Sequence, residues 1–224
     1  MRQAIVPGPV RIDGIKIWDR WDNLVNPPDG FSIDLSRFEN SWYSSGRSRL
    51  MEALWFFLGL PLLRWTLAPF SSYRVSILKL FGASIGAGVV IKPGLRVKYP
   101  WLLRVGHHSW LGEDVWIDNL APIDIADNVC ISQGAYLCTG NHNWSDPAFG
   151  LRVQPITLRA GSWVGARSVV CPGVEFGEGS IAAAGSVVMN SLAPWTIYAG
   201  NPATLRRTRV IKAVSDRNDK ASCE

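Results

Sequence analysis

The sequence predicts a mainly β protein folded as a parallel β-helix, the solenoid in which a short repeat winds into stacked coils. The first observation is a six-residue period of large aliphatic residues between positions 85 and 188. The second is that this segment is rich in glycine and β-branched residues, and the third is that its period differs from the 3.6 residues of an α-helix. Fourteen of the fifteen periodic positions hold Val, Ile, Leu or Phe, and the exception is Ala182. The fifteen positions are Ile85, Ile91, Val97, Val105, Leu111, Ile117, Ile125, Ile131, Leu137, Leu158, Val164, Val170, Phe176, Ala182 and Val188.

The other positions of the six-residue unit agree with this fold. The residue after the aliphatic one is small or suited to turns, as in Gly86, Gly112 and Gly165, and the fourth residue after it is small, as in Ser109 and Ser168. Each unit is one short strand and a corner, so three units make a triangular coil of about 18 residues. Small residues suit the corners because a bulky side chain would collide there.

The order of segments along the chain predicts one solenoid with covered ends. Residues 1–46 are polar and irregular, and 47–81 form an apolar helical segment that we expect to cap the first coil. The end of a solenoid needs such a cover because its strand edges are unpaired. Residues 82–192 form the β-helix, with one looped insertion at 139–157, and 193–224 close the other end and continue as a basic tail.

Composition excludes several classes of protein. The chain has 224 residues, of which 47% are hydrophobic and 18% charged, and this balance excludes intrinsic disorder. The net charge of +5 is modest and concentrated near the C-terminus, so no basic stripe indicates a nucleic-acid partner. Four cysteines without a disulfide framework fit a reducing compartment, and the polar N-terminus lacks the apolar core of a secretory signal. We therefore expect a cytoplasmic protein.

One apolar run needs a test against membrane insertion. Residues 53–63 carry no charge, but Arg64 follows directly and Pro61 interrupts the run. A spanning helix needs about 20 apolar residues, so a span is not expected. Two alternatives remain: a helix packed on the protein itself or on a second subunit, which we favour, and a helix lying in the membrane interface at the inner face of the membrane.

The insertion is the first place to search for chemistry, because loops that leave a regular scaffold often carry function. It contains His142, one of only three histidines, and histidine is the side chain best suited to accept a proton near neutral pH. His107 and His108 are neighbours, so on a strand they would face opposite sides and could not easily bind one metal ion. We expect no metal site.

At this point the residues resemble a known family. The six-residue repeats, the looped-out His142 and the closing segment 198–203 are similar to the left-handed β-helix (hexapeptide-repeat) acyltransferases. The segments 81–94, 116–122 and 130–144 are most similar to the colanic acid biosynthesis acetyltransferase group, and the resemblance covers about residues 33–207. It implies a left-handed coil, a homotrimer, and acetyl-CoA bound as co-substrate in the groove between neighbouring β-helices.

The resemblance also implies roles for individual residues. His142 matches the general base, although Asn141 stands between the glycine and the histidine here, and Asn119 and its neighbour Asp118 match positions that contact the acceptor. The family often has Thr-Lys where this chain has Met189-Asn190. The positions that match the coenzyme site are Trp163, Gly165, Ala166, Ala184 and Arg207.

These matches predict an acetyl-CoA-dependent O-acetyltransferase that acts on a sugar hydroxyl in exopolysaccharide biosynthesis of the colanic-acid kind. The acceptor would be a sugar or a lipid-linked saccharide. An amine acetyltransferase of the serine type is a weaker alternative, because the long helical N-terminal domain of those enzymes is missing. A catalytically silent β-helix that serves as an assembly scaffold is the third alternative, and the histidine on the insertion argues against it.

Overall fold

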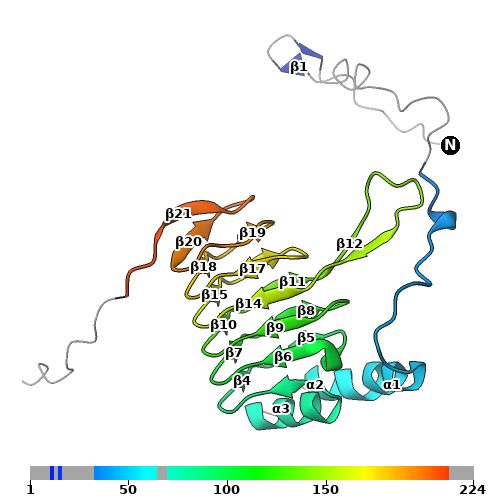
Figure 1. Ribbon diagram of the computed structural model, residues 1–224, viewed down its shortest axis with the longest axis vertical. Helices are drawn as coiled ribbons and strands as arrows, with labels where there is room; N and C mark the ends of the chain where they lie inside the picture. The colour runs from blue at the N-terminus through cyan, green and yellow to red at the C-terminus, as the bar shows by residue number, and fades with distance from the viewer. Residues whose placement is uncertain (1–10, 13–14, 17–32, 65–69, 212–224) are drawn as a thin grey trace, which may run out of the picture. The chain divides into compact units, whose positions relative to one another are not determined.

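A computed structural model describes residues 11–12, 15–16, 33–64 and 70–211, and it confirms the predicted parallel β-solenoid (Figure 1). Three sheets form its faces, each named here by its first strand, and their strands run parallel except for the last strand of the chain. The β3 sheet contains β3 (Ser84–Ile85), β6 (Leu103–Val105), β9 (Ile123–Ile125), β14 (Ile156–Leu158) and β17 (Glu175–Phe176). The β4 sheet contains β4 (Val90–Ile91), β7 (Trp110–Leu111), β10 (Cys130–Ile131), β15 (Trp163–Val164), β18 (Ile181–Ala182), β20 (Thr196–Ala199) and β21 (Thr204–Thr208). The β5 sheet contains β5 (Arg96–Val97), β8 (Trp116–Asp118), β11 (Tyr136–Cys138), β16 (Val169–Val170) and β19 (Val187–Val188).

The core of the solenoid consists of the side chains that the repeat predicts. All fifteen periodic residues are buried, and neighbouring strands place them in register, as Ile117 of β8 beside Leu137 of β11. On each strand the residue directly before the periodic one faces outward, because successive side chains of a strand point to opposite sides. This alternation leaves one exposed row of side chains on each sheet.

Small residues hold the corners between the sheets. Ser109 is fully buried, and its hydroxyl donates to the carbonyl of Ala126 at 2.7 Å and accepts from the N–H of Val129 at 3.0 Å. At Gly165 a Cβ would lie 2.5 Å from the nitrogen of Ala184 in the next coil, so a larger residue would separate the coils.

The predicted helical segment covers the first coil. It comprises α1 (Arg49–Leu54), the π-helix η3 (Trp55–Gly59), α2 (Leu60–Arg64) and α3 (Ser71–Leu80). The buried Trp55 donates its indole N–H to the carbonyl of Val97 at 3.0 Å, and Leu63 and Leu78 are buried in the same core. A Cβ at Gly59 would clash with the indole of Trp55, so this glycine lets the π-helix close over the tryptophan.

The outer side of this helical segment is apolar and exposed. Leu50, Phe56, Phe57 and Leu58 are between 53 and 77% exposed. Among the helices within the described residues, none is both long enough and apolar enough to span a bilayer.

The predicted insertion contains a hairpin, which follows strand β11 of the β5 sheet. Strand β12 (Gly140–His142) pairs antiparallel with β13 (Leu151–Val153). A shorter corner follows β5, where the 3₁₀ helix η4 (Pro100–Leu102) leads into β6. At the other end of the solenoid, β20 pairs parallel with β18 and antiparallel with β21.

A second compact unit consists of residues 1–39 and 143–150, the latter being the tip of the insertion. Its described elements are β1 (Arg11–Ile12), which pairs antiparallel with β2 (Ile15–Lys16), and the 3₁₀ helix η2 (Leu35–Arg37). Within this unit the N–H of Asp34 donates to the carbonyl of Pro147 at 2.9 Å.

One expectation about the histidine pair is wrong. His107 and His108 lie in the corner turn between β6 and β7, not on a strand, and His108 has a φ of 56°. His107 accepts a hydrogen bond at Nδ1 from the N–H of Ala87 at 3.1 Å, so this imidazole ties the corners of two coils together. Of the predicted basic tail, residues 212–224 lie outside the described part of the chain.

Candidate acetyl-transfer site

The outer row of the β5 sheet begins with stacked aromatic and cationic side chains. Arg96, Trp116 and Tyr136 occupy equivalent positions on β5, β8 and β11, each one residue before a buried aliphatic residue. The rings of Trp116 and Tyr136 stack with centroids 4.5 Å apart, and the Arg96 guanidinium lies 4.5 Å above the Trp116 ring. This contact holds Arg96 against an indole.

Asp118, predicted from the family resemblance as an acceptor contact, lies at the end of β8 beside this row. The ammonium of Lys98 is 3.0 Å from its Oδ1, and the phenol of Tyr136 donates to its Oδ2 at 3.1 Å. Burial, with contributions from Cys138 and Asp118, raises the pKa of Tyr136, so its hydroxyl remains a donor to the carboxylate. The carboxylate is therefore fixed from two sides.

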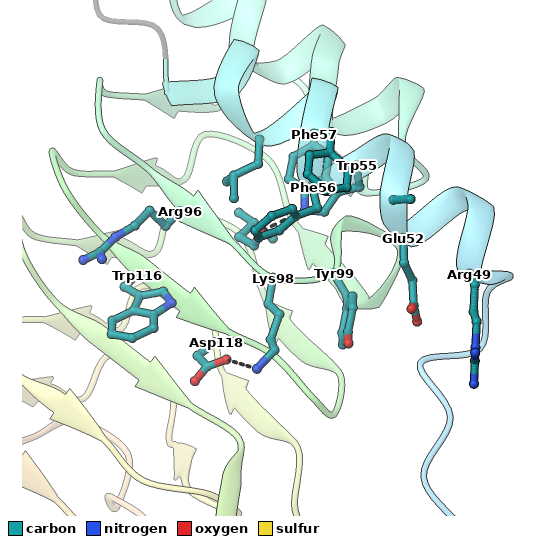
Figure 2. A pocket seen from close by; sticks show the side chains of 13 residues that line it. Arg49, Glu52, Trp55, Phe56, Phe57, Arg96, Lys98, Tyr99, Trp116 and Asp118 are labelled. Carbon is teal, nitrogen blue, oxygen red and sulfur yellow. Dashed lines mark hydrogen bonds and ion pairs between the residues drawn. The ribbon is translucent and has the colours of Figure 1, made fainter. Parts of the chain in front are cut away.

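A pocket of about 650 Å³ opens between the helical segment and the first two strands of the β5 sheet (Figure 2). Its volume lies within the range of small-molecule sites. Burial raises the pKa of Tyr99 in its wall, as do the charges of Glu52 and Asp118, so this phenol also stays protonated. The side chains and backbone that line the pocket belong to Arg49, Glu52, Ala53, Trp55, Phe56, Phe57, Leu60, Arg96, Val97, Lys98, Tyr99, Trp116 and Asp118.

The hairpin that carries His142 starts beside this pocket. Fully buried Thr139, at its base, donates its N–H and its hydroxyl to the carbonyl of Asp118 at 3.2 and 3.1 Å. The same hydroxyl accepts from the N–H of Ala121 at 2.9 Å. The base of the hairpin is thus attached to the strand end that presents the Asp118 carboxylate.

His142 itself is half-buried on β12, opposite Leu151. Its N–H donates to the side-chain oxygen of Asn141 at 2.8 Å. Asn141 is the extra residue between the glycine and the histidine that distinguishes this chain from the family it resembles. Here its side-chain oxygen binds the N–H of the histidine that follows it.

Asn119, the other predicted acceptor contact, is fully buried. Its amide donates to the carbonyl of Tyr99 at 2.7 Å and accepts from the N–H of Tyr99 at 3.0 Å. In this structure the side chain positions Tyr99 in the pocket wall, and its contact with an acceptor stays an untested prediction.

We expect Asn119→Ala to weaken acceptor binding indirectly and to destabilise the fold. The substitution leaves the buried N–H and carbonyl of Tyr99 without their partner, at a cost of about 1–3 kcal/mol. The free energy of unfolding, measured in urea, should fall by that amount. Asp118→Asn is the matched control, because its side chain, 17% exposed, still offers an oxygen to Lys98 and Tyr136 as an amide. It should change acceptor KM with little loss of stability; equal stability losses in both variants would contradict the distinction.

Four of the five residues predicted to bind the coenzyme lie at or next to the corner between the β4 sheet and the β5 sheet. Gly165 and Ala166 form the turn between β15 and β16, and the N–H of Gly185, next to Ala184, donates to the Ala166 carbonyl at 2.8 Å. Trp163 lies on β15 just before this turn, and its indole donates to Ser132 at 2.8 Å. Arg207 lies apart from this group, on β21 at the edge of the β4 sheet.

Within one chain this corner and the hairpin do not meet. The corner connects the β4 sheet to the β5 sheet, whereas β12 begins after the β5 sheet has ended. The width of the β5 sheet therefore separates Gly165, Ala166 and Ala184 from His142.

Comparison with known proteins shows which protein family the chain is related to. No family model matches the sequence. It is 36% identical over 177 residues to the colanic acid biosynthesis acetyltransferase WcaF of Escherichia coli, covering 79% of this chain and 97% of that protein.

This chain belongs to the WcaF family of acetyltransferases.

More distant relatives share the fold. The galactoside O-acetyltransferase of Escherichia coli is 28% identical over 148 residues, which are 65% of this chain and 70% of that protein. The crystal structure of a hexapeptide-repeat acetyltransferase from Vibrio cholerae matches with a TM-score of 0.66 at 24% identity, covering 73% of this chain and 94% of that one. The galactoside acetyltransferase structure with coenzyme A matches with a TM-score of 0.65 at 22% identity, over 73% and 84%. The predicted acyltransferase class is thus confirmed.

The structure of this acetyltransferase adds pocket residues that sequence analysis missed. Arg96, Lys98 and Tyr99 line the pocket but lie outside the segments that carry the resemblance, and Trp116 begins one of these segments without having been assigned a role. A signal for two of them was present, because Arg96, Trp116 and Tyr136 recur at intervals of 20 residues directly before inward residues. Within the described residues, no group of three or more His, Cys, Asp or Glu side chains could hold a metal ion.

Proposed function

We propose that this acetyltransferase uses acetyl-CoA to acetylate a saccharide hydroxyl in exopolysaccharide biosynthesis of the colanic-acid kind. The observation that carries the proposal is the attachment of the His142 hairpin to the end of β8, where Asp118 enters an aromatic-walled pocket. The name of WcaF supports the biosynthetic role, and that of the galactoside O-acetyltransferase supports transfer to a sugar oxygen. The solved structures of the Vibrio cholerae hexapeptide-repeat acetyltransferase with acetyl-CoA and of the galactoside acetyltransferase with coenzyme A support the co-substrate.

The pocket offers the chemistry that a saccharide needs. The ring of Trp116 provides an apolar surface for the C–H face of a sugar, and Asp118 accepts from sugar hydroxyls. Tyr99 contributes a phenol that remains a hydrogen-bond donor or acceptor. We therefore assign this pocket to the acceptor.

In the proposed reaction, His142 accepts the proton of the sugar hydroxyl as general base. The oxygen attacks the carbonyl carbon of the acetyl thioester, so a C–O bond forms and the C–S bond breaks. The imidazolium then returns its proton to the coenzyme A thiolate, which leaves as the free thiol. A backbone N–H would stabilise the oxyanion between these steps.

We further propose that the protein acts as a homotrimer, with the coenzyme in the groove between neighbouring solenoids. The separation of the coenzyme corner from the hairpin supports this, because a neighbouring copy can supply the corner that one chain places too far from its own His142. Trp163, Gly165, Ala166 and Ala184 would bind the pantetheine arm, and Arg207 the phosphates.

Thiol release tests the proposed function. The full chain should release coenzyme A from acetyl-CoA when neutral saccharides, sugar phosphates or nucleotide sugars are added as acceptors, and mass spectrometry should show an acetyl group on an acceptor oxygen. Acetylation of an amine in preference to a hydroxyl would contradict the proposal. Binding of acetyl-CoA without transfer to any acceptor would favour the scaffold alternative.

We also propose a peripheral contact with the cytoplasmic face of a membrane, made by the exposed apolar side of α1 and η3. Leu54, Phe56, Phe57 and Leu58 would enter the interface, and Arg64 would meet anionic headgroups. The wild type should co-sediment with vesicles of phosphatidylcholine and phosphatidylglycerol, and the double variant Phe57→Ser, Leu58→Ser should lose most of this binding. Leu205→Ser, a similarly exposed site on β21, is the control. Equal sedimentation of all three proteins would contradict the contact.

A further inference from the structure

Two half-buried thiols lie in neighbouring coils at the end of the β5 sheet. Cys138 is the last residue of β11, and Cys171 directly follows β16. These strands pair parallel with Leu137 beside Val170, so the register places the next residues, Cys138 and Cys171, beside each other. Both follow a buried aliphatic residue, so both side chains leave the sheet on its outer side.

The spacing of the two cysteines suits a disulfide. Neighbouring strands lie about 4.8 Å apart, within the Cα separations of about 4.4–6.8 Å that disulfides join. Cys171 lies beyond the end of its strand and precedes a turn at Pro172 and Gly173, so its backbone is not held in a ladder on both sides. Both side chains are free thiols in this structure.

Cys138 also contacts the hairpin that carries His142, which leaves the solenoid directly after β11 (Figure 1). The Cys138 thiol donates to the carbonyl of Gly140, the first residue of β12, at 3.0 Å. Thr139, between them, makes the hydrogen bonds that attach the hairpin to β8. A disulfide would remove the thiol proton and turn the sulfur toward the neighbouring coil, so Gly140 would lose its donor. The start of the hairpin therefore depends on the oxidation state of Cys138.

We propose that Cys138 and Cys171 form a dithiol modification site, which hydrogen peroxide converts to a disulfide that slows acetyl transfer. One thiolate attacks a peroxide oxygen, the O–O bond breaks, and a sulfenic acid and hydroxide form. The second thiol attacks the sulfenic sulfur, the S–S bond forms and water leaves. In total the two thiols lose two electrons and two protons, and the peroxide is reduced to two waters. This inference rests on the proposed function only for its effect on transfer.

The surroundings of Cys171 set the conditions of the test. Burial, together with the charge of Cys138, raises the pKa of Cys171, so this thiol keeps its proton at neutral pH. Because the thiolate is the attacking species, oxidation should be run at about pH 8.5.

Peroxide treatment of the full chain, followed by alkylation and peptide mass spectrometry, tests the site. We expect a peptide pair joined through Cys138 and Cys171, about two mass units lighter than the two free peptides. The kcat of thiol release should fall about threefold or more, because displacement of a catalytic group is costly, and dithiothreitol should restore it. Cys171→Ser should keep its kcat through the same treatment. Cys130→Ser is the matched control, because it removes a half-buried thiol on the β4 sheet and should respond like the wild type.

Two results would overturn the dithiol site: equal alkylation of Cys138 and Cys171 before and after peroxide, or a bridge between any other pair of the four cysteines. Hydrogen exchange gives a readout that needs no acceptor, since β12 should exchange faster once the Cys138 thiol no longer binds Gly140. A Cys138–Cys171 disulfide that leaves both this exchange and kcat unchanged would overturn the effect on the hairpin. Faster exchange in a protein that transfers no acetyl group would contradict only the proposed function.

Discussion

Replacing His142 with alanine should lower kcat about 10²- to 10⁴-fold, the contribution typical of a positioned general base. The hairpin base depends on Thr139 and its hydrogen bonds to β8, and the substitution leaves these untouched. The affinity for acetyl-CoA should therefore remain within twofold of the wild type, and so should the urea midpoint. Steady-state thiol release at saturating acetyl-CoA, with coenzyme binding measured by calorimetry, separates the two effects.

A second histidine variant makes this result specific. His108→Asn changes another imidazole in a corner turn, and asparagine tolerates the positive φ at that position. Its turnover should equal that of the wild type. A kcat for His142→Ala within threefold of the wild-type value would remove the general-base assignment.

The solenoid core could be predicted from the sequence because each of its contacts repeats a local rule. Ile117 and Leu137 face inward for the same reason that Val97 does, and their positions in successive coils follow from the period alone. The insertion was equally visible as an interruption of that period. Both features can therefore be predicted from the positions of aliphatic residues along the sequence, without knowledge of tertiary contacts.

The pocket could not be predicted in the same way. It joins a helical segment near Phe56 to strands that begin 40 residues later at Arg96, and no local pattern fixes how the helix lies over the first coil. That placement depends on the hydrogen bond from Trp55 to Val97 and on the glycine at position 59. The indole of Trp55 occupies the space that any side chain at position 59 would need. These are tertiary contacts, so the periodicity carries no trace of them.

Asn119 shows the same limit at a single residue. An asparagine at a solenoid corner can face solvent and contact a ligand, or turn inward and bond to a backbone. Only the structure shows that the carbonyl and N–H of Tyr99 lie within 2.7 and 3.0 Å of this amide. Its neighbour Asp118 remains partly accessible, so two adjacent residues with the same predicted role differ in what they can touch.

The largest stability effect is expected at Phe176. Its side chain is fully buried and is the largest apolar one among the periodic positions, with Leu158 of β14 on one side and Leu192 on the other. Phe176→Ala should lower the free energy of unfolding by about 3–5 kcal/mol, because it removes the ring and leaves a cavity between coils. Urea unfolding measures this loss, and Met189→Ala, at a site 59% exposed, should change stability by less than about 0.5 kcal/mol.

The position of Phe176 also predicts where the loss occurs. In a solenoid each coil is stabilised mainly by its immediate neighbours, so weakening one interface near an end releases the coils beyond it first. Hydrogen exchange in Phe176→Ala should accelerate in β17 to β21 while β3 to β8 keep their protection. Such local opening would reach the Ala184 corner but not the helix-covered pocket, so coenzyme binding should weaken more than binding of a pocket ligand. Uniform acceleration in all coils would instead indicate that the solenoid unfolds as one cooperative unit.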